Sequence, residues 1–307
     1  MGLFFKKMSY WSDKLNKFGA DMFKHYYNRT KDLSLKQIDR RARFLSNLYY
    51  KIDKKRMDIA RNNMKIAFGD KYSSKEIEQL IKDCLYNFCV EFFMFFTIGH
   101  KPKDVIREMF TYEHKDYVDE ALAMGKGVIF LTGHIGNWEF LARRLCYDGI
   151  ILSVIARDSD HVGITEVTNN IRNSGGYSVY SKDRPLMGII KALKRKETIG
   201  ILPDQSNEDG IWVKFFGADA KTAAGTAMFS LKTGAPIVPV FAIRESLGKY
   251  RLDAYPMIKY EPTGNMDEDV KNLTQLCNDA LEKEIRENPS SWLWIHNRFK
   301  PYEREEN

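Results

Sequence analysis

The feature that most constrains the fold is an alternation of short apolar runs with amphipathic stretches, which begins at about residue 115. Such alternation is typical of an α/β protein with a largely parallel central sheet flanked by helices. The predicted strands span residues 127–132, 150–156, 177–180, 198–203 and 236–243, with 250–256 as an edge strand. The predicted helices between and after them span 137–148, 162–173, 184–195, 222–233 and 267–287.

The part of the chain before this alternation carries helical patterns. Two basic helices are predicted at residues 36–52 and 54–68. A third helix begins at a capping box, in which Ser73 is the N-cap and Glu76 stands at the third helical position. It extends to about Phe96.

Five phenylalanines occupy residues 88–96 of this third helix, which is apolar almost all round. The segment is too short to span a bilayer, so it either packs in the core or contacts lipid, for example as the wall of an acyl-chain site. We predict a helical, basic, membrane-associating region over residues 1–110 and an α/β core over 111–307. Because no long linker separates them, we expect the two to form one structural unit.

Basic residues are concentrated in the first quarter of the chain. Residues 1–66 contain seventeen Lys and Arg and six Asp and Glu, a balance of +11, so the remainder carries 7 − 11 = −4 of the total +7. Such a segment suits a polyanion or an anionic membrane surface, although a solvated helical face explains any single cluster. No nucleic-acid recognition motif accompanies the charge, and we predict no nucleic-acid partner.

We predict no spanning helix, because no window of about 18 apolar residues occurs. We also predict no signal peptide, because the first residues lack a long apolar stretch followed by small residues. Apolar residues between Leu3 and Phe18 recur at helical spacing, interleaved with lysines. This pattern fits an interfacial helix on a membrane, and it fits equally a helix packed on the core.

Histidine and cysteine are present without the spacing of metal ligands. The six histidines are scattered and the four cysteines form no C-x-x-C pair. We therefore predict no metal site, and free thiols in a reducing compartment.

The stretch 127–140, G-V-I-F-L-T-G-H-I-G-N-W-E-F, places a histidine just beyond a predicted buried strand. Loops at the carboxyl ends of strands are where open α/β sheets bind ligands, and His134 lies in such a loop. Asn137 is a suitable N-cap for the next helix. Glu139 falls in the first turn of that helix, and we expect its carboxylate to hydrogen-bond the imidazole. A histidine held in this way can deprotonate an alcohol at neutral pH, whereas a structural histidine in a glycine turn is the alternative.

Polar residues also follow two other predicted strands. Arg157 comes directly after the strand at 150–156, and Asp204 and Gln205 come directly after the strand at 198–203. Each alone is compatible with a surface turn. Together with the histidine loop they could line one crevice at the carboxyl edge of the sheet, where an arginine can hold a phosphate or carboxylate.

A third candidate region surrounds Thr222 and Gly225. Thr222 is a good N-cap residue, and small residues after it would let an anionic head group approach the backbone N–H groups of the helix start. Close packing of this helix on the sheet is the competing explanation.

Several of these segments together resemble the lauroyl/myristoyl (late) acyltransferases of lipid A biosynthesis, within the lysophospholipid acyltransferase superfamily. The resemblance runs in order from about residue 57 to 301. The matching motifs are R-N-N-M-K-I-A-F, T-G-H-I-G-N-W-E, A-R-D, I-R-N-S-G-G, L-P-D-Q, F-F-G with T-A-A-G-T, K-T-G-A-P-I-V-P-V and W-L-W-I-H-N-R-F-K.

The resemblance implies a catalytic H-x4-E pair, which carries over to His134 and Glu139. It implies that the D-Q pair and the arginine of A-R-D contact substrate, with Arg157 or backbone N–H groups stabilising the oxyanion. Gly133 and Gly136 are expected to keep the backbone clear for the thioester. The full set of predicted substrate-binding residues is Gly136, Asn137, Arg157, Arg172, Asp204, Gln205, Thr222 and Gly225.

The function implied is transfer of a fatty acyl chain from an acyl carrier protein or coenzyme A thioester to a hydroxyl of a lipid A precursor. The hydroxyl attacks directly, without an acyl-enzyme, and no cofactor is needed. The implied partners are an anionic glycolipid acceptor, the acidic acyl carrier protein and a membrane surface.

The implied location is the cytoplasmic face of a bacterial inner membrane. Members of the family usually begin with a hydrophobic anchor, and residues 1–27 offer only a shorter basic and aromatic stretch, so peripheral attachment is expected. Open alternatives are another glycolipid or lysophospholipid as acceptor, hydrolysis of the donor, and an inactive membrane-binding scaffold.

Overall fold

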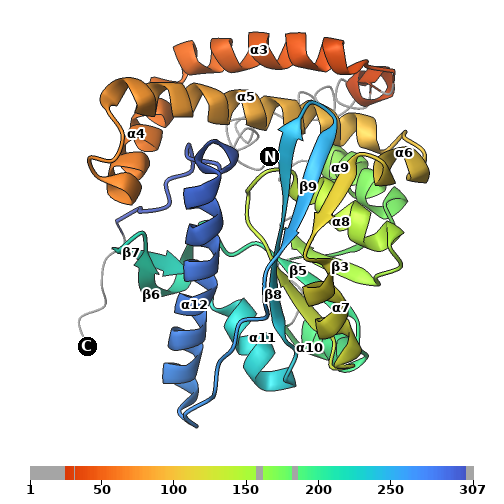
Figure 1. Ribbon diagram of the computed structural model, residues 1–307, viewed down its shortest axis with the longest axis vertical. Coiled ribbons are helices and arrows are strands. Elements are labelled where there is room, and N and C mark those ends of the chain that lie inside the picture. The colour runs from red at the N-terminus through yellow and green to blue at the C-terminus, as the bar shows by residue number, and fades with distance from the viewer. Residues whose placement is uncertain (1–24, 31, 157–161, 182–185, 302–307) are drawn as a thin grey trace.

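A computed structural model describes residues 25–30, 32–156, 162–181 and 186–301 (Figure 1). The strands are β1 (Phe110–Glu113), β2 (Val128–Leu131), β3 (Leu152–Ala156), β4 (Ser178–Ser181), β5 (Thr198–Ile201), β6 (Ser206–Phe215), β7 (Ala218–Thr222), β8 (Ile237–Ser246) and β9 (Lys249–Ala254). The helices are α3 (Leu35–Ile52), α4 (Lys54–Phe68), α5 (Ser74–Ile98), α6 (Lys103–Arg107), α7 (Lys115–Ala123), α8 (Trp138–Tyr147), α9 (Val162–Ser174), α10 (Leu186–Lys194), α11 (Gly225–Thr233), α12 (Met266–Glu287) and a short 3₁₀ turn, η1 (Pro289–Ser291).

Seven strands form the central sheet, in the order β1-β9-β8-β2-β5-β3-β4. Every neighbouring pair is parallel except β8 and β9. The predicted α/β class with a largely parallel sheet is therefore confirmed. The prediction that residues 250–256 form an edge is wrong, because β9 pairs with β8 on one side and with β1 on the other.

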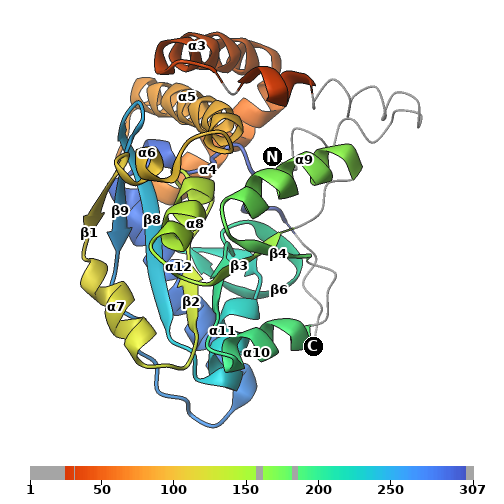
Figure 2. The same cartoon turned by 90° about the vertical axis from the view of Figure 1, so that its right-hand side faces the viewer.

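Both faces of the sheet are buried, as continuous apolar strands require. Alternate residues of β2 point to opposite sides: Ile129 and Leu131 join a core with α10, α11 and α12, whereas Val128 and Phe130 join a core with α7, α8 and α9. Figure 1 shows α12 and α7 on opposite sides of the central strands, and Figure 2 shows the molecule from the side of α7, α8 and α9.

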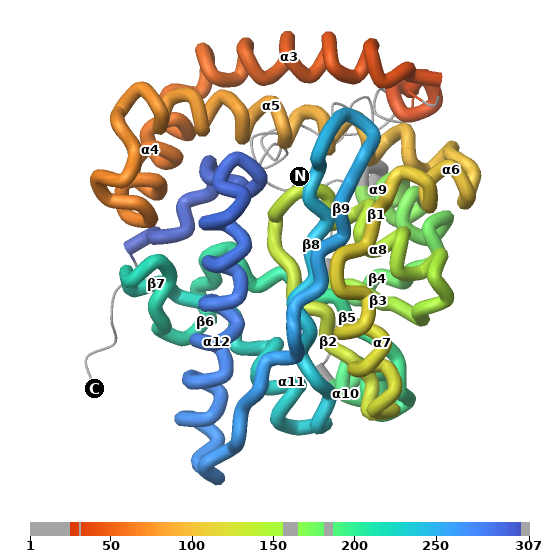
Figure 3. The backbone as a smooth tube through the Cα atoms, viewed as in Figure 1, coloured from red at the N-terminus to blue at the C-terminus, as the bar shows by residue number. Residues whose placement is uncertain are grey.

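The amino-terminal helices lie across one end of the sheet, which the tube in Figure 3 shows most simply. Helix α5 begins at the predicted capping box: the side chains of Ser73 and Glu76 each bond the other residue's backbone N–H. Helix α3 packs along α5 as an outer layer through the small or apolar residues Ile38, Ala42 and Ser46. Across the described ranges, none of the helices has the length and hydropathy required to cross a membrane.

Helix α4 shares a core with the sheet, since Met64 and Leu131 belong to one apolar cluster. The division of the chain at about residue 110 stays a prediction. The apolar and basic pattern between Leu3 and Phe18, which fits either an interfacial helix or a helix packed on the core, lies outside the described residues.

A two-stranded hairpin, β6–β7, stands apart from the main sheet and was not predicted. It ends at Thr222, which is fully buried as the last residue of β7. Helix α11 starts three residues later than predicted, with Ala224 at the N-cap position and no side-chain cap. Thr222 is therefore not the N-cap that its sequence context suggested.

Candidate active site

The loop between β2 and α8 is held by backbone contacts that need glycine. Gly136 has a φ of +57°, and a Cβ there would lie 2.0 Å from the carbonyl oxygen of Ala242 in β8. Its N–H donates to the carbonyl of Ser291, and the N–H of Asn137 donates to Ala242, both over 2.9 Å. The N–H of Gly136 is thus engaged within the protein, and the glycine permits close packing against β8. Its predicted role beside the thioester stays a prediction.

The loop brings His134 beside Asp204. Strands β2 and β5 are paired in parallel, so the segments that follow them emerge next to each other. Nδ1 of His134 lies 2.9 Å from Oδ1 of Asp204, and the backbone N–H of His134 donates to Oδ2 over 2.9 Å. Gly133 leaves room for this contact, because a Cβ at that position would approach Cγ of Asp204 to 3.2 Å.

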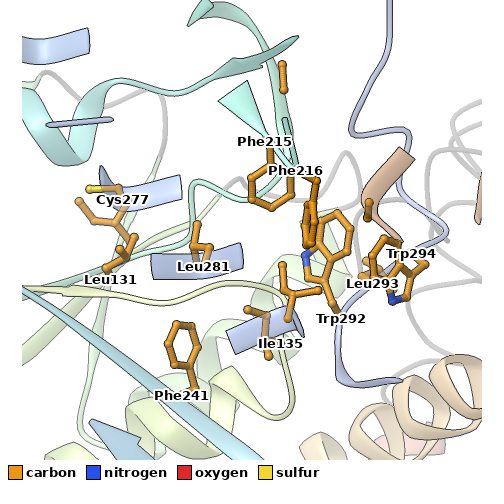
Figure 4. Packing of buried hydrophobic residues seen from close by; sticks show 14 of the residues in the cluster. Leu131, Ile135, Phe215, Phe216, Phe241, Cys277, Leu281, Trp292, Leu293 and Trp294 are labelled. Atoms are coloured by element: carbon orange, nitrogen blue, oxygen red, sulfur yellow. The ribbon is translucent and has the colours of Figure 1, made fainter. Parts of the chain in front are cut away.

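Trp292 completes the surroundings of Asp204. Its Nε1–H donates to Oδ2 over 2.9 Å. The indole is itself buried, with its ring centroid 5.6 Å from that of Phe215, and Figure 4 shows it among Ile135, Phe215 and Trp294. The sequence offered a signal for this residue in the W-L-W-I motif, but no role followed from the motif alone.

The environment of Asp204 keeps its carboxylate ionised. Burial by itself would raise the pKa, but the charge interaction with His134 and the hydrogen bonds from His134 and Trp292 lower the pKa of Asp204 to about 2. An ionised Asp204 accepts, so Nδ1 of His134 donates to it, and in the neutral imidazole this tautomer leaves the lone pair on Nε2. The imidazole is 21% exposed, and its ring stands edge-on to Trp138 with centroids 4.9 Å apart.

The structure does not bring Glu139 to His134, which corrects the predicted contact. Glu139 is buried in the first turn of α8 and accepts from Arg172 (Nη2, 2.6 Å) and from the hydroxyl of Tyr177 (2.7 Å). Burial would raise the pKa of Glu139, but the Arg172 guanidinium and Tyr177 hold it below its usual value. Nε of Arg172 also lies 3.2 Å from both carboxylate oxygens of Glu139. The substrate contact of Arg172 stays a prediction.

Asn137 has two roles in the loop. Its Oδ1 accepts the N–H of Phe140 over 2.9 Å, which confirms the predicted N-cap. Its side-chain amide donates to Glu91 of α5, a buried residue that also accepts from Tyr250 (2.8 Å) and from Nε of Arg244 (2.9 Å). Burial raises the pKa of Glu91 despite these partners. Sequence reasoning missed this cluster, which ties α5 to the start of α8.

A small pocket beside the histidine shares two lining residues with a large apolar cavity. A small pocket beside His134 is walled in part by Phe88, Trp138 and Leu293. Phe88 and Leu293 also line a cavity of about 650 Å³ between α3 and α5. The other residues lining this cavity are Tyr26, Arg40, Arg41, Phe44, Leu45, Tyr49, Leu85, Cys89, Phe92, Phe93 and Ile295.

The remaining predicted residues are dispersed. Gln205 is half-buried beside Asp204 at the same strand end, and Arg157 lies outside the described residues. The hydroxyl of Thr222 is held by Arg298 and, over 3.3 Å, by the amide of Asn278, so it is part of the packing of the hairpin. Gly225 opens α11 against the ring of Phe229.

No group of three or more His, Cys, Asp or Glu side chains within the described ranges is arranged to hold a metal ion. The prediction that the reaction needs no metal or cofactor stays a prediction.

The family model described as bacterial lipid A biosynthesis acyltransferase matches residues 32–301. The chain belongs to this family. The predicted resemblance is thereby confirmed, and the protein is an acyltransferase.

Individual members of the family are distant in sequence. The chain is 26% identical over 253 residues to the lipid A biosynthesis palmitoleoyltransferase of Escherichia coli (strain K12), a match that covers 80% of this chain and 79% of the relative. It is 26% identical over 189 residues to the lipid A biosynthesis lauroyltransferase of the same organism, covering 60% of each. The phosphatidylinositol mannoside acyltransferase of Mycobacterium tuberculosis (strain ATCC 25618 / H37Rv) is 24% identical over 182 residues, covering 58% of this chain and 56% of the relative.

Proposed function

We propose that this acyltransferase moves a fatty acyl chain from a thioester donor to a hydroxyl of a lipid A precursor, with His134 as the general base. The observation that carries the proposal is the pairing of His134 with an ionised Asp204, next to a small pocket that shares Phe88 and Leu293 with the large apolar cavity. A base and a chain-sized apolar site are what acyl transfer to an alcohol requires. The names of the Escherichia coli relatives support the choice of a lipid A precursor as acceptor.

The chemical step is direct attack of the acceptor on the thioester. Nε2 of His134 takes the proton of the acceptor hydroxyl as its oxygen attacks the carbonyl carbon. The tetrahedral intermediate then collapses: the C–S bond breaks, the ester C–O bond remains, and the imidazolium returns its proton to the departing thiolate. Asp204 holds the ring with Nε2 outward and stabilises the imidazolium, and such base catalysis typically contributes ~10²–10⁴-fold to the rate.

The apolar cavity is the proposed site for the acyl chain of the donor. Its volume of about 650 Å³ falls within the ~300–1,000 Å³ that is usual for small-molecule sites. Each methylene buried there contributes about 0.8 kcal/mol to binding. Since Phe88 and Leu293 border both spaces, a chain in the cavity would leave its thioester next to His134.

Glu139 is assigned a positioning role in place of the predicted contact with His134. Its ion pair with Arg172 connects the start of α8 to α9 and so fixes the helix that follows the histidine loop. Asn137 and Glu91 fix the same helix start from the side of α5. The substrate contacts expected for Arg157, Gln205 and Gly225 stay part of the proposal.

The proposed donor is acyl carrier protein, with coenzyme A as the alternative carrier. Acyl carrier protein is acidic, and the excess of positive charge in residues 1–66 offers it a complementary surface. Attachment to the cytoplasmic face of the inner membrane would be peripheral. A second acceptor class, a glycosylated phospholipid, is favoured by the similarity to the mycobacterial phosphatidylinositol mannoside acyltransferase.

The proposal is tested by expressing the chain in a bacterial strain that lacks its late lipid A acyltransferases and weighing the extracted lipid A. We expect a mass increase equal to one acyl group, with His134→Ala as the inactive control. Unchanged lipid A together with a newly acylated phospholipid would move the assignment to the second acceptor class. Equal activity of the wild type and His134→Ala would exclude His134 as the base.

A further inference from the structure

One face of α3 exposes a stripe of large apolar side chains. Phe44, Leu48 and Ile52 are spaced by four residues, so they share one face of the helix, and they are 70%, 42% and 68% exposed. A different face of α3, that of Ile38, Ala42 and Ser46, packs on α5. Figures 1 and 3 show α3 as the outermost layer at this end of the molecule.

Positive charge flanks the apolar stripe. Helix α3, which is described throughout, contains five cationic residues and a single acidic one, Asp39. Asp39 accepts hydrogen bonds from Arg43 (3.0 Å) and from Tyr86, and is therefore neutralised locally. The cationic residues are Lys36, Arg40, Arg41, Arg43 and Lys51.

The apolar cavity reaches the same helix. Phe44 belongs both to the exposed stripe and to the cavity lining, and Arg40 and Arg41 line the cavity beside it. The stripe, the flanking charge and the cavity therefore meet at one surface.

We propose that this face of α3 lies in the interface of an anionic lipid bilayer, with Leu48 and Ile52 at the level of the acyl chains and the flanking cations among the head groups. An amphipathic helix with an apolar stripe and a basic polar face binds membranes in this orientation. A second copy of the chain is a poorer occupant, because pairing two such faces would bring like charges together. The inference rests on the proposed function, and it assigns the membrane contact to α3.

The test uses the full chain in vesicle cosedimentation, with vesicles of phosphatidylethanolamine and phosphatidylglycerol compared with phosphatidylcholine alone. We expect binding to the anionic vesicles that weakens in high salt. The double variant Leu48→Ser/Ile52→Ser should lose about tenfold or more of this affinity, because two large apolar side chains no longer bury in the interface. Ile151→Ser is the matched control: Ile151 is 72% exposed and lies outside α3, so its loss should leave vesicle binding unchanged.

Turnover in detergent separates this inference from the proposed function. With donor and glycolipid acceptor dispersed in micelles, the double variant should match the wild type, whereas with acceptor in vesicles it should be slower. Vesicle binding that is unaffected by the double variant, or reduced equally by Ile151→Ser, would overturn the membrane face. So would concentration-dependent dimerisation that the double variant abolishes while vesicle binding persists. A wild-type protein that binds vesicles through this face but transfers no acyl group would reject the function alone.

Discussion

Asp204 accepts two hydrogen bonds from His134, one from the backbone N–H and one from Nδ1, although seventy residues separate them in the chain. The two residues meet because β2 and β5 are parallel neighbours in the sheet. The bidentate contact fixes both the backbone and the ring of the histidine. Because Nδ1 is bound to Asp204, Nε2 is the ring nitrogen that can accept a proton from a substrate. The orientation of the ring is set by the carboxylate of Asp204, which is 1% exposed.

Replacing Asp204 should reduce turnover nearly as much as replacing His134. In Asp204→Asn the side-chain amide no longer requires a proton on Nδ1 and gives no charge to stabilise the imidazolium, so we expect kcat to fall by about 10²-fold or more. His134→Ala should abolish transfer while the protein stays folded. Thioester consumption, with circular dichroism as the control for folding, measures both variants. An Asp204→Asn variant with wild-type kcat would show that Asp204 does not support His134 as the general base.

The Glu139–Arg172 pair should matter first for stability. Glu139→Gln leaves a buried guanidinium without its counter-charge, and removing one partner of a buried pair costs about 3–5 kcal/mol. We expect the free energy of unfolding in urea to fall by about this amount, with a smaller loss of kcat than in Asp204→Asn. If Glu139 instead acted on His134 directly, Glu139→Gln would reduce kcat as strongly as Asp204→Asn at unchanged stability.

The two carboxylates show what sequence reasoning could establish and where it stopped. Strand and helix positions follow from local patterns of burial, capping and glycine, and for this reason the predicted parallel sheet and the capping box at Ser73 agree with the structure. Asp204 is the partner of His134 because β2 and β5 are neighbours in the sheet, and the spacing of residues along the sequence does not reveal the order of the strands. Glu139 is five residues away from His134 in the sequence, but its carboxylate binds Arg172 and Tyr177 instead. Arg172 belongs to α9, and Tyr177 directly precedes β4.

Local patterns also failed where a segment's partner lay elsewhere in the fold. Strand β1 has four residues, of which only Phe110 is buried, so its sequence shows no alternation of buried and exposed residues. Because β1 was not predicted, its partner β9 was expected to be the edge strand. Thr222 has the side chain of a helix cap, but pairing with β6 keeps it in a strand.

Acid should destabilise the protein through Asp204. Its folded pKa of about 2 lies below the unfolded value of 3.8, so the carboxylate stabilises the fold above about pH 4 and loses this contribution as the pH falls toward 2. The shift corresponds to about 2 kcal/mol. Urea unfolding of the wild type and Asp204→Asn between pH 6 and pH 2 measures it. The difference in stability between the two should shrink as the pH falls, and a constant difference would show that the carboxylate is not selectively stabilised in the fold.

Filling the apolar cavity should shorten the acyl chain that the enzyme prefers. Leu45 is a half-buried residue of α3 that lines the cavity, and Leu45→Trp would occupy part of its volume of about 650 Å³. Long chains would then lose buried methylenes at about 0.8 kcal/mol each, whereas short chains would fit as before. Competition between thioesters of increasing chain length gives the ratio of kcat/KM values, which is independent of the amount of active enzyme. Leu48→Trp, one turn further along α3 and outside the cavity lining, should leave the ratio unchanged, since any effect on membrane contact applies to all donors alike. An unchanged ratio in Leu45→Trp would place the acyl chain elsewhere.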